Sequence, residues 1–196
     1  MDLYEQGIKR VVPVISGKGG VGKSSTALQL ALSLCQTFPE AKIGLLDVDL
    51  CGPSIPRMLN LVKAPIKQGS CGWLPVQADG QLRVMSVGFL LGGGEEAVVW
   101  RGPKKTAMIK QFLSSVEWGP LDWLIVDTPP GTSDEHLTLV EALHGHPWCK
   151  ALLVSTPQLV AISDVRKQID FCRQTGLNIW GLLENMAGYQ CSQCGE

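Results

Sequence analysis

The sequence predicts an α/β fold: a mostly parallel sheet with helices on both faces. Short β-branched or Leu-rich runs alternate along the chain with stretches of helical spacing, the pattern of parallel strands joined by crossover helices. Apolar residues make up 45% of the chain and charged residues only 18%, a balance expected when strands are buried on both faces. Because 196 residues suit one such domain and are few for two, we expect a single domain over residues 1–196.

The first half of the chain combines buried strands, a long helix and a hairpin. The turn-forming pair Asp79-Gly80 separates two strand-like runs and predicts the hairpin. In order, the expected elements are a strand over residues 11–16, a helix from the loop at Gly17 to about residue 34, a strand over 42–47, a short helix near Pro53 and Pro56, and hairpin strands over 73–76 and 82–86.

The second half alternates helices and strands. Pro103 suits the first position of a helix, and either Ser133 or Asp134 suits the cap of the next one. In order, the expected elements are a helix over residues 105–116, a strand over 123–127, a helix over 134–143, a strand over 151–155, a helix over 162–174 and a strand over 179–184. In a parallel sheet, ligands bind at the carboxyl ends of such strands.

Charge and hydropathy disfavour nucleic acid and membrane as partners. The net charge is -1, and no basic run is long enough to follow a phosphate backbone or an anionic bilayer. The longest apolar stretches fall short of the ~18 to 20 residues that cross a membrane. The polar start of the chain leaves no room for a signal peptide before the first strand, and seven scattered cysteines suit reduced thiols. We therefore expect a cytoplasmic protein.

A phosphate-binding loop is the strongest motif. Residues 17–24 match G-x-x-x-x-G-K-[ST] between a hydrophobic strand and a helix, the context in which backbone N–H groups and the helix dipole bind phosphate. Lys23 is expected to reach the β- and γ-phosphates, and the Ser24 hydroxyl to ligate Mg²⁺. The expected nucleotide-binding residues of this segment are Gly17, Lys18, Gly19, Gly20, Val21, Gly22, Lys23, Ser24 and Ser25.

Acidic side chains follow two further strands. Asp47 and Asp49 end one strand and Asp127 ends another, where a parallel sheet presents ligand groups. Asp127 resembles a Walker B aspartate, which holds Mg²⁺ through water, and Gly131 after it would sense the γ-phosphate. Asp49, or failing that Asp47, would orient the attacking water. For Asp47 and Asp49 a capping role is the alternative.

A cysteine pair near the end of the chain suggests a soft-metal site. Cys191 and Cys194 are spaced so that both sulfurs can face one metal, but an iron–sulfur cube or a tetrahedral zinc needs about four ligands. No second C-x-x-C is present, so a dimer would have to complete the site. A structural zinc half-site, a redox dithiol and an incidental pair remain alternatives.

The loop contains an additional lysine, Lys18, before the usual Lys23. In this feature it resembles the loop of the deviant Walker A ATPases, which include the nitrogenase iron protein and the partitioning and division-site ATPases. The resemblance implies that Lys18 crosses a dimer interface to the partner's nucleotide, as a trans arginine finger does elsewhere. A solvated loop lysine is the alternative. It also implies that the amide of Asn185 pairs with adenine, although an asparagine after a strand is more often a turn former.

Residues 16–24, 46–56, 99–103, 127–135 and 184–188 together resemble the Mrp and ApbC family of iron–sulfur scaffold ATPases, and the resemblance covers nearly the whole chain. Within that family, residues 88–91 and 100–105 resemble the short subunit of the eukaryotic cytosolic scaffold. The resemblance implies a slow ATPase that uses ATP and Mg²⁺ to assemble a [4Fe–4S] cluster on Cys191 and Cys194 at a dimer interface. It further implies transfer of that cluster to cytosolic and nuclear apoproteins.

The resemblance also implies partners and locations. The partners are a second copy, or a longer homologous scaffold ATPase in a heterotetramer, together with apoprotein recipients and targeting factors. The location is the cytoplasm, with the nucleus in addition. A partitioning or positioning ATPase that controls association with DNA or membrane is the alternative function, and a small-molecule kinase or synthetase is a third.

Two departures from the family pattern limit what carries over. Ser192 stands where the family usually has proline. Family members also continue for many tens of residues past the cysteine pair, so relative to them the chain is expected to be C-terminally truncated. A sheet edge and apolar faces would then be exposed, and we expect a marginal or partner-dependent fold.

Overall fold

A computed structural model of the chain describes residues 3–50, 52–90, 102–188, 190–191 and 193–195. A seven-stranded sheet with the order β5-β6-β2-β7-β1-β8-β9 forms its centre. Every neighbouring pair is parallel except β5 and β6, which are antiparallel. The strands are β1 (Val11–Ile15), β2 (Ile43–Asp47), β5 (Val76–Asp79), β6 (Leu82–Ser86), β7 (Trp123–Asp127), β8 (Lys150–Ser155) and β9 (Asn178–Glu184).

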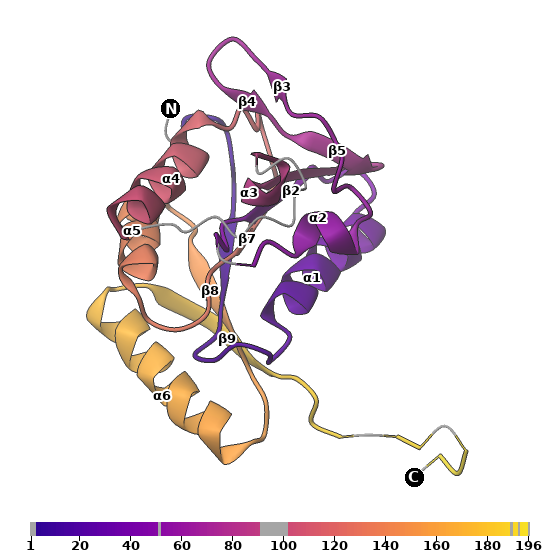
Figure 1. Cartoon of the computed structure of the whole chain (residues 1–196), viewed down its shortest axis with the longest axis vertical. Helices are drawn as coiled ribbons and strands as arrows, with labels where there is room; N and C mark the ends of the chain where they lie inside the picture. Colours follow the sequence, from indigo (N-terminus) through magenta and orange to yellow (C-terminus); the bar gives the residue numbers. More distant parts are fainter. Residues whose placement is uncertain (1–2, 51, 91–101, 189, 192, 196) are drawn as a thin grey trace.

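Helices cover both faces of this sheet, as the sequence predicts. The crossover from β1 to β2 runs in one direction along the sheet, whereas those from β6 to β7, β7 to β8 and β8 to β9 run in the other. Because parallel crossovers are right-handed, α1 lies on one face and α4, α5 and α6 on the opposite face (Figure 1). The helices are α1 (Lys23–Thr37), α2 (Ile55–Met58), α3 (Val87–Leu90), α4 (Gly102–Ser115), α5 (Asp134–Leu143) and α6 (Leu159–Gln174).

Burial of the central strands accounts for their continuous apolar sequences. Every residue of β1 and β2 is buried, including Pro13 and Gly44. Pro13 lies inside β1, and Gly44 leaves room for Trp118 and two leucines, because a Cβ there would lie 2.6 Å from the Leu121 side chain. On α4, Ile109, Phe112 and Leu113 are buried at helical spacing. The core thus matches the periodicity from which the fold is predicted.

The hairpin expected over residues 73–76 and 82–86 is wrong in its first strand. Pro75 divides that segment, because proline has no amide hydrogen for a strand ladder. Residues before it form β4 (Trp73–Leu74), which pairs with β3 (Lys67–Gln68) in a separate two-stranded sheet. Residues after it form β5, which turns at Gly80 (φ +48°) and pairs antiparallel with β6. The hairpin therefore exists, but it is β5-β6.

The other predicted elements agree with the structure to within about three residues, whereas α3 and β3 were not predicted. α6 begins at Leu159 rather than at residue 162, and α4 begins at Gly102 rather than at 105. Residues 99–101 of the family stretch 99–103 lie outside the described residues, as do residue 51 of the stretch 46–56, residue 91 of the stretch 88–91 and Ser192. Within the described ranges, no helix combines the length and hydropathy needed to cross a membrane.

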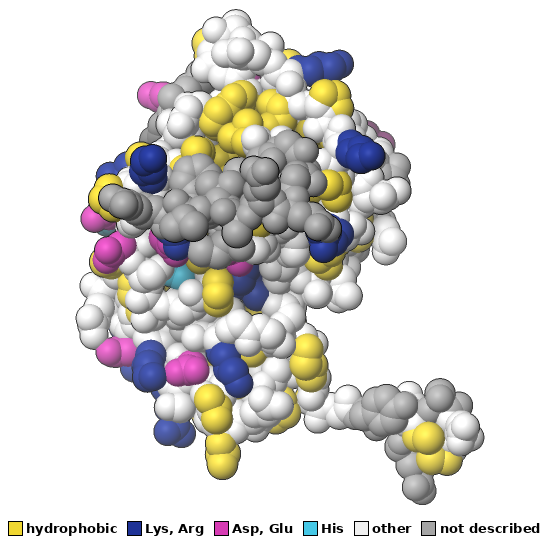
Figure 2. All heavy atoms as spheres, viewed as in Figure 1, with side chains coloured by type: hydrophobic (Ala, Val, Ile, Leu, Met, Phe, Trp, Pro, Cys, Tyr) yellow, Lys and Arg dark blue, Asp and Glu magenta, His cyan; other side chains and the backbone are white. Residues whose placement is uncertain are grey.

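Strand β9 is an edge strand with apolar residues on its surface. It pairs with β8 on one side, and Trp180 and Leu182 are 44% and 54% exposed. Ile179 and Leu183 are also exposed. On the face drawn in Figure 2 apolar side chains form scattered groups, and a small one lies where the C-terminal tail leaves the body. The exposed edge expected from the sequence is therefore present, and the marginal fold remains a prediction.

Three tryptophans meet at the end of the sheet opposite to the carboxyl ends of its strands. Trp180 of β9 stacks on Trp123 of β7 with ring centroids 5.8 Å apart, and Trp148 contacts both rings edge-on. Arg10 and Lys150 lie over two of the rings, 4.7 Å and 5.1 Å from their centroids. These contacts hold the first half of β9 against the body.

We predict that the isolated chain unfolds at low temperature and associates through β9. Leu182→Lys is expected to reduce association, because a charge on an edge strand opposes pairing with another chain. Leu159→Lys is the control: Leu159 is 84% exposed, but it lies on a helix with no open ladder. Size-exclusion chromatography over a concentration series, with thermal melts, measures both. A cooperative high-temperature melt, or equal effects of the two substitutions, would contradict the prediction.

Candidate functional site

The loop between β1 and α1 has the backbone geometry of a phosphate site. Gly20 and Gly22 have φ values of +81° and +86°, which favour glycine. The carbonyl of Gly22 accepts the N–H of Thr26, so α1 starts directly from the loop and its first N–H groups lie at the loop. A Cβ on Gly19 or Gly20 would meet nothing within 4 Å, whereas one on Gly22 would lie 2.3 Å from the amide nitrogen of Asn185.

Lys23, the first residue of α1, and Asp127, the last residue of β7, form a buried ion pair. The Lys23 ammonium donates to Oδ1 of Asp127 and lies 3.4 Å from the Ser24 hydroxyl. Burial raises the pKa of Asp127, while Lys23 and Ser24 oppose that rise. Oδ2 of Asp127 is buried, and no described residue hydrogen-bonds to it. An unpaired carboxylate oxygen beside a hydroxyl suits Mg²⁺, which takes hard oxygen ligands.

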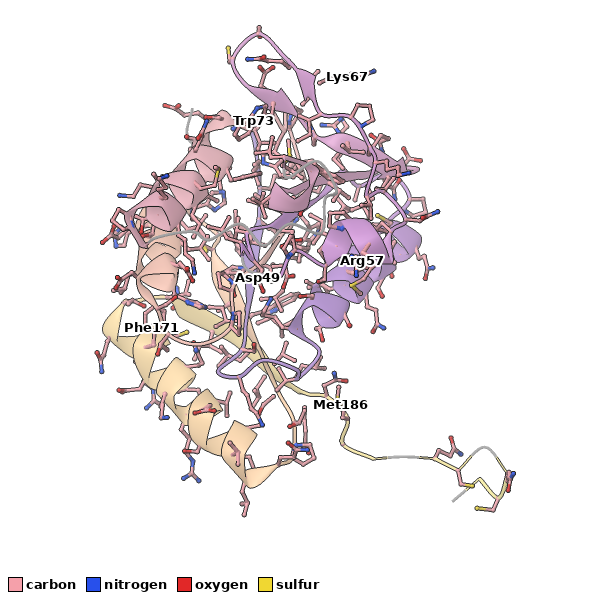
Figure 3. The ribbon with its side chains drawn as sticks, viewed as in Figure 1. Asp49, Arg57, Lys67, Trp73, Phe171 and Met186 are labelled. Atoms are coloured by element: carbon pink, nitrogen blue, oxygen red, sulfur yellow. The ribbon has the colours of Figure 1, made fainter. Side chains whose placement is uncertain are left out.

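Asp47 and Asp49 lie in different environments. Asp47 is fully buried and accepts hydrogen bonds from the Ser86 hydroxyl (2.9 Å), from the N–H of Asp49 (3.1 Å) and from the N–H of Ile55 (3.4 Å). Burial, with the nearby Asp127 charge, raises the pKa of Asp47 to about 7. Asp49 is half-buried, accepts the N–H of Gly52 at 3.2 Å and lies near the centre of the molecule (Figure 3).

The loop after β7 is held by contacts from three other elements. Gly131 (φ +89°) donates its N–H to the carbonyl of Ser16 at 2.9 Å and accepts the side-chain amide of Gln168 at 2.6 Å. His136, fully buried on α5, accepts the N–H of Ser133 through Nδ1 and completes a capping box. Burial lowers the pKa of His136 to about 4. Ser133, rather than Asp134, is therefore the cap.

Sequence analysis missed His136 and Gln168. Gln168 lies in the stripe Ala161, Val165, Gln168 and Cys172, which α6 buries. A polar residue within an apolar stripe at helical spacing was the available signal.

The remaining loop residues differ in exposure, and Asn185 contacts the loop. Lys18 and Ser25 are exposed, while Gly17 packs so closely on α6 that a Cβ there would lie 2.6 Å from the Asp164 backbone. Asn185 follows β9, and its Nδ2 donates to the carbonyl of Val21 at 2.9 Å. The predicted pairing of Asn185 with adenine remains a prediction, as does the reach of Lys18 into a partner.

Cys191 and Cys194 lie on the tail that leads from β9 away from the body (Figure 1). The N–H groups of Cys194 and Gln193 and the Cys194 thiol lower the pKa of Cys191, which favours a thiolate. Burial instead raises the pKa of Cys149 to about 12 and that of Cys172 to about 11. No group of three metal-ligating side chains occurs among the described residues. One copy of this segment therefore supplies two thiols.

Comparison with known proteins identifies the family. Residues 7–196 match the family model described as ParA: NUBPL iron-transfer P-loop NTPase. The chain belongs to this family. It is 58% identical to a protein of Trichoplax adhaerens named cytosolic Fe-S cluster assembly factor NUBP2 homolog, over 96% of this chain and 71% of that protein. It is 56% identical to the NUBP2 protein of Bos taurus, with coverage of 97% and 70%.

Solved structures confirm the expected fold. A nucleotide-binding protein from Archaeoglobus fulgidus in complex with ADP superimposes with a TM-score of 0.81 and 37% identity, covering 98% of this chain and 72% of that one. The cell division ATPase MinD of Pyrococcus furiosus superimposes with a TM-score of 0.64 at 20% identity, over 90% and 72% of the two chains. The latter likeness shows the fold alone.

Asp47 and His136 are expected to give opposite pH dependences of stability. Between pH 4 and 7 the folded chain keeps a proton on Asp47 that the unfolded chain releases, so this group favours the fold as the pH falls. Between pH 6.5 and 4 the unfolded chain protonates this histidine while the folded chain leaves it neutral, so His136 disfavours the fold as the pH falls.

Two variants separate these effects. For each protein, the change in melting temperature on acidification from about pH 7 to about pH 5 is compared with that of the unmodified chain. This change should be more positive for His136→Gln and more negative for Asp47→Asn. Each kcal/mol of stability corresponds to about 2–4 °C in a chain of this size. Nucleotide-free thermal melts at both pH values measure the effect. Identical pH profiles for all three proteins would contradict this assignment.

Proposed function

We propose that this chain is an ATP-dependent scaffold that assembles a [4Fe–4S] cluster and passes it to apoproteins. The observation that carries the proposal is the contact between the phosphate loop and the segment leading to the cysteines. Asn185 donates to the carbonyl of Val21 and stands six positions before Cys191. Family membership and relatives named cytosolic Fe-S cluster assembly factors support it.

The nucleotide site would work by exchange of ionic partners. On binding ATP, Lys23 would turn from Asp127 to the β- and γ-phosphates, and Asp127 with Ser24 would hold Mg²⁺. Mg²⁺, when bound, neutralises charge on the phosphates. Asp49 is the better candidate to orient water, because it is only half-buried, whereas Asp47 fixes the backbone around it through three accepted hydrogen bonds. Hydrolysis would be slow and linked to cluster assembly or release.

The cluster, as cargo, would be held between two chains. Cys191 and Cys194 supply two thiolates, and the second pair would come from another copy or from a longer homologous ATPase in a heterotetramer. Apoprotein recipients and targeting factors would be further partners, in the cytoplasm and the nucleus. The family match favours this function over a partitioning or positioning ATPase, since the likeness to MinD extends only to the fold.

The two loop lysines are predicted to have separable roles. Lys23→Ala should lower affinity for ATP and ADP by about two orders of magnitude, and it leaves Asp127 buried without its cation. Lys18→Ala should keep both affinities within about threefold but lower the hydrolysis rate at least tenfold, because exposed Lys18 would act on a partner's nucleotide. Calorimetry and phosphate release measure these effects. Normal hydrolysis by Lys18→Ala would contradict the role in trans.

Cluster binding is predicted to require both tail cysteines. Anaerobic reconstitution with iron and sulfide should give thiolate-to-iron absorption that Cys191→Ala and Cys194→Ala abolish. Cys71→Ala is the matched control, because Cys71 is exposed like Cys194 and is distant in sequence from both tail cysteines. Colour that persists in both tail variants would remove the cluster assignment. Equal transfer to an apoprotein with and without Mg-ATP would remove the coupling.

A further inference from the structure

Helix α6 places a fully buried amide against the loop that follows β7. Gln168 has 0% exposure, and its Nε2 donates to the carbonyl of Gly131 at 2.6 Å. Its Oε1 is buried and has no hydrogen-bond partner in the part of the chain described by the structure. An aliphatic side chain would fill this position without burying an unpaired side-chain oxygen such as Oε1. Packing alone therefore does not account for glutamine here.

The glycine that Gln168 contacts is held at both of its backbone polar groups. The N–H of Gly131 donates to the carbonyl of Ser16, the last residue before the phosphate loop, while its carbonyl accepts from Gln168. Because φ of Gly131 is +89°, a side chain here would be strained. The position of Gly131 therefore depends on one hydrogen bond to Ser16, which follows β1, and one to α6.

The same helix also contacts the start of the phosphate loop. Asp164, one turn before Gln168, packs so closely on Gly17 that no Cβ fits there. Further along α6, Phe171 lies edge-on to His136 of α5, with centroids 6.1 Å apart, and Figure 3 shows Phe171 beside α5. One face of α6 thus contacts the phosphate loop, the Gly131 carbonyl and helix α5.

We propose that Gln168 is a positioning residue that gives the site its discrimination between ATP and ADP. Its amide holds Gly131 by the carbonyl, so that the N–H of the same residue can leave Ser16 for a γ-phosphate without rebuilding the loop. This inference rests on the proposed ATPase function and adds a residue outside the motifs that define it. Since only ATP has a γ-phosphate, Gln168 affects ATP binding and hydrolysis and leaves ADP binding unchanged.

The test compares ATP and ADP affinity in the full chain. Gln168→Met keeps the length of the side chain and removes the amide, and Gln174→Met makes the same change at an exposed position of α6, where Gln174 contacts Asp170. We expect Gln168→Met to bind ADP within about twofold of the unmodified chain and ATP about tenfold more weakly, a difference of about 1.4 kcal/mol. Gln174→Met should bind both nucleotides normally.

Gln168→Glu adds a readout that a purely structural role would not change. An ionised carboxylate cannot donate to the Gly131 carbonyl, whereas a protonated one can, and burial raises a carboxyl pKa. The ATP preference of Gln168→Glu should therefore be lost at pH 8 and return toward pH 6, while that of Gln168→Met stays low at both. The pH dependence of the unmodified chain is the reference.

The outcomes are distinguishable. Unchanged ATP preference in Gln168→Met, or an equal loss of ATP and ADP affinity, would overturn the role of Gln168 while leaving the ATPase proposal intact. An absence of pH recovery in Gln168→Glu would also count against it. If the unmodified chain bound neither nucleotide, the proposed function and this inference would fall together.

Discussion

The buried pair of Lys23 and Asp127 is the interaction on which the site depends. Both side chains are nearly inaccessible to water, and either charge alone would be strongly destabilising there. The parallel register of β1 and β7 brings them together, because Val14 pairs with Asp127 just before the phosphate loop begins. Separating the pair leaves each charge buried without a partner, so the separation is favourable only where another ion takes the partner's place.

The sequence predicted what local patterns determine. The phosphate loop has fixed spacing, and Asp47, Asp49 and Asp127 each end a continuous apolar run, so their convergence at one edge followed from parallel strands. Pro75, which divides the expected strand 73–76, was also visible in the sequence. The distinction between Asp47 and Asp49 was not visible in the sequence, since Asp47 accepts a hydrogen bond from Ser86, a residue far along the chain.

Gln168 and His136 show more clearly what a local sequence pattern does not reveal. Each is a polar residue on a buried helix face, and such a pattern does not reveal which backbone group the side chain reaches. The partners of both lie in the loop between β7 and α5, whose path is set by tertiary packing. The cysteine pair is the opposite case: Cys191 and Cys194 are close in sequence, so their proximity and their shortage of ligands were evident from spacing alone.

The tryptophan group at the far end of the sheet has an optical consequence. Trp180 of the edge strand stacks on Trp123 of a central strand, so these two indoles share a fixed relative orientation only while β9 is docked. Near-ultraviolet circular dichroism reports such fixed aromatic packing. Because the group lies away from the phosphate loop, its signal would follow detachment of β9 separately from events at the nucleotide, and fraying of the edge would become visible before the centre of the sheet opens.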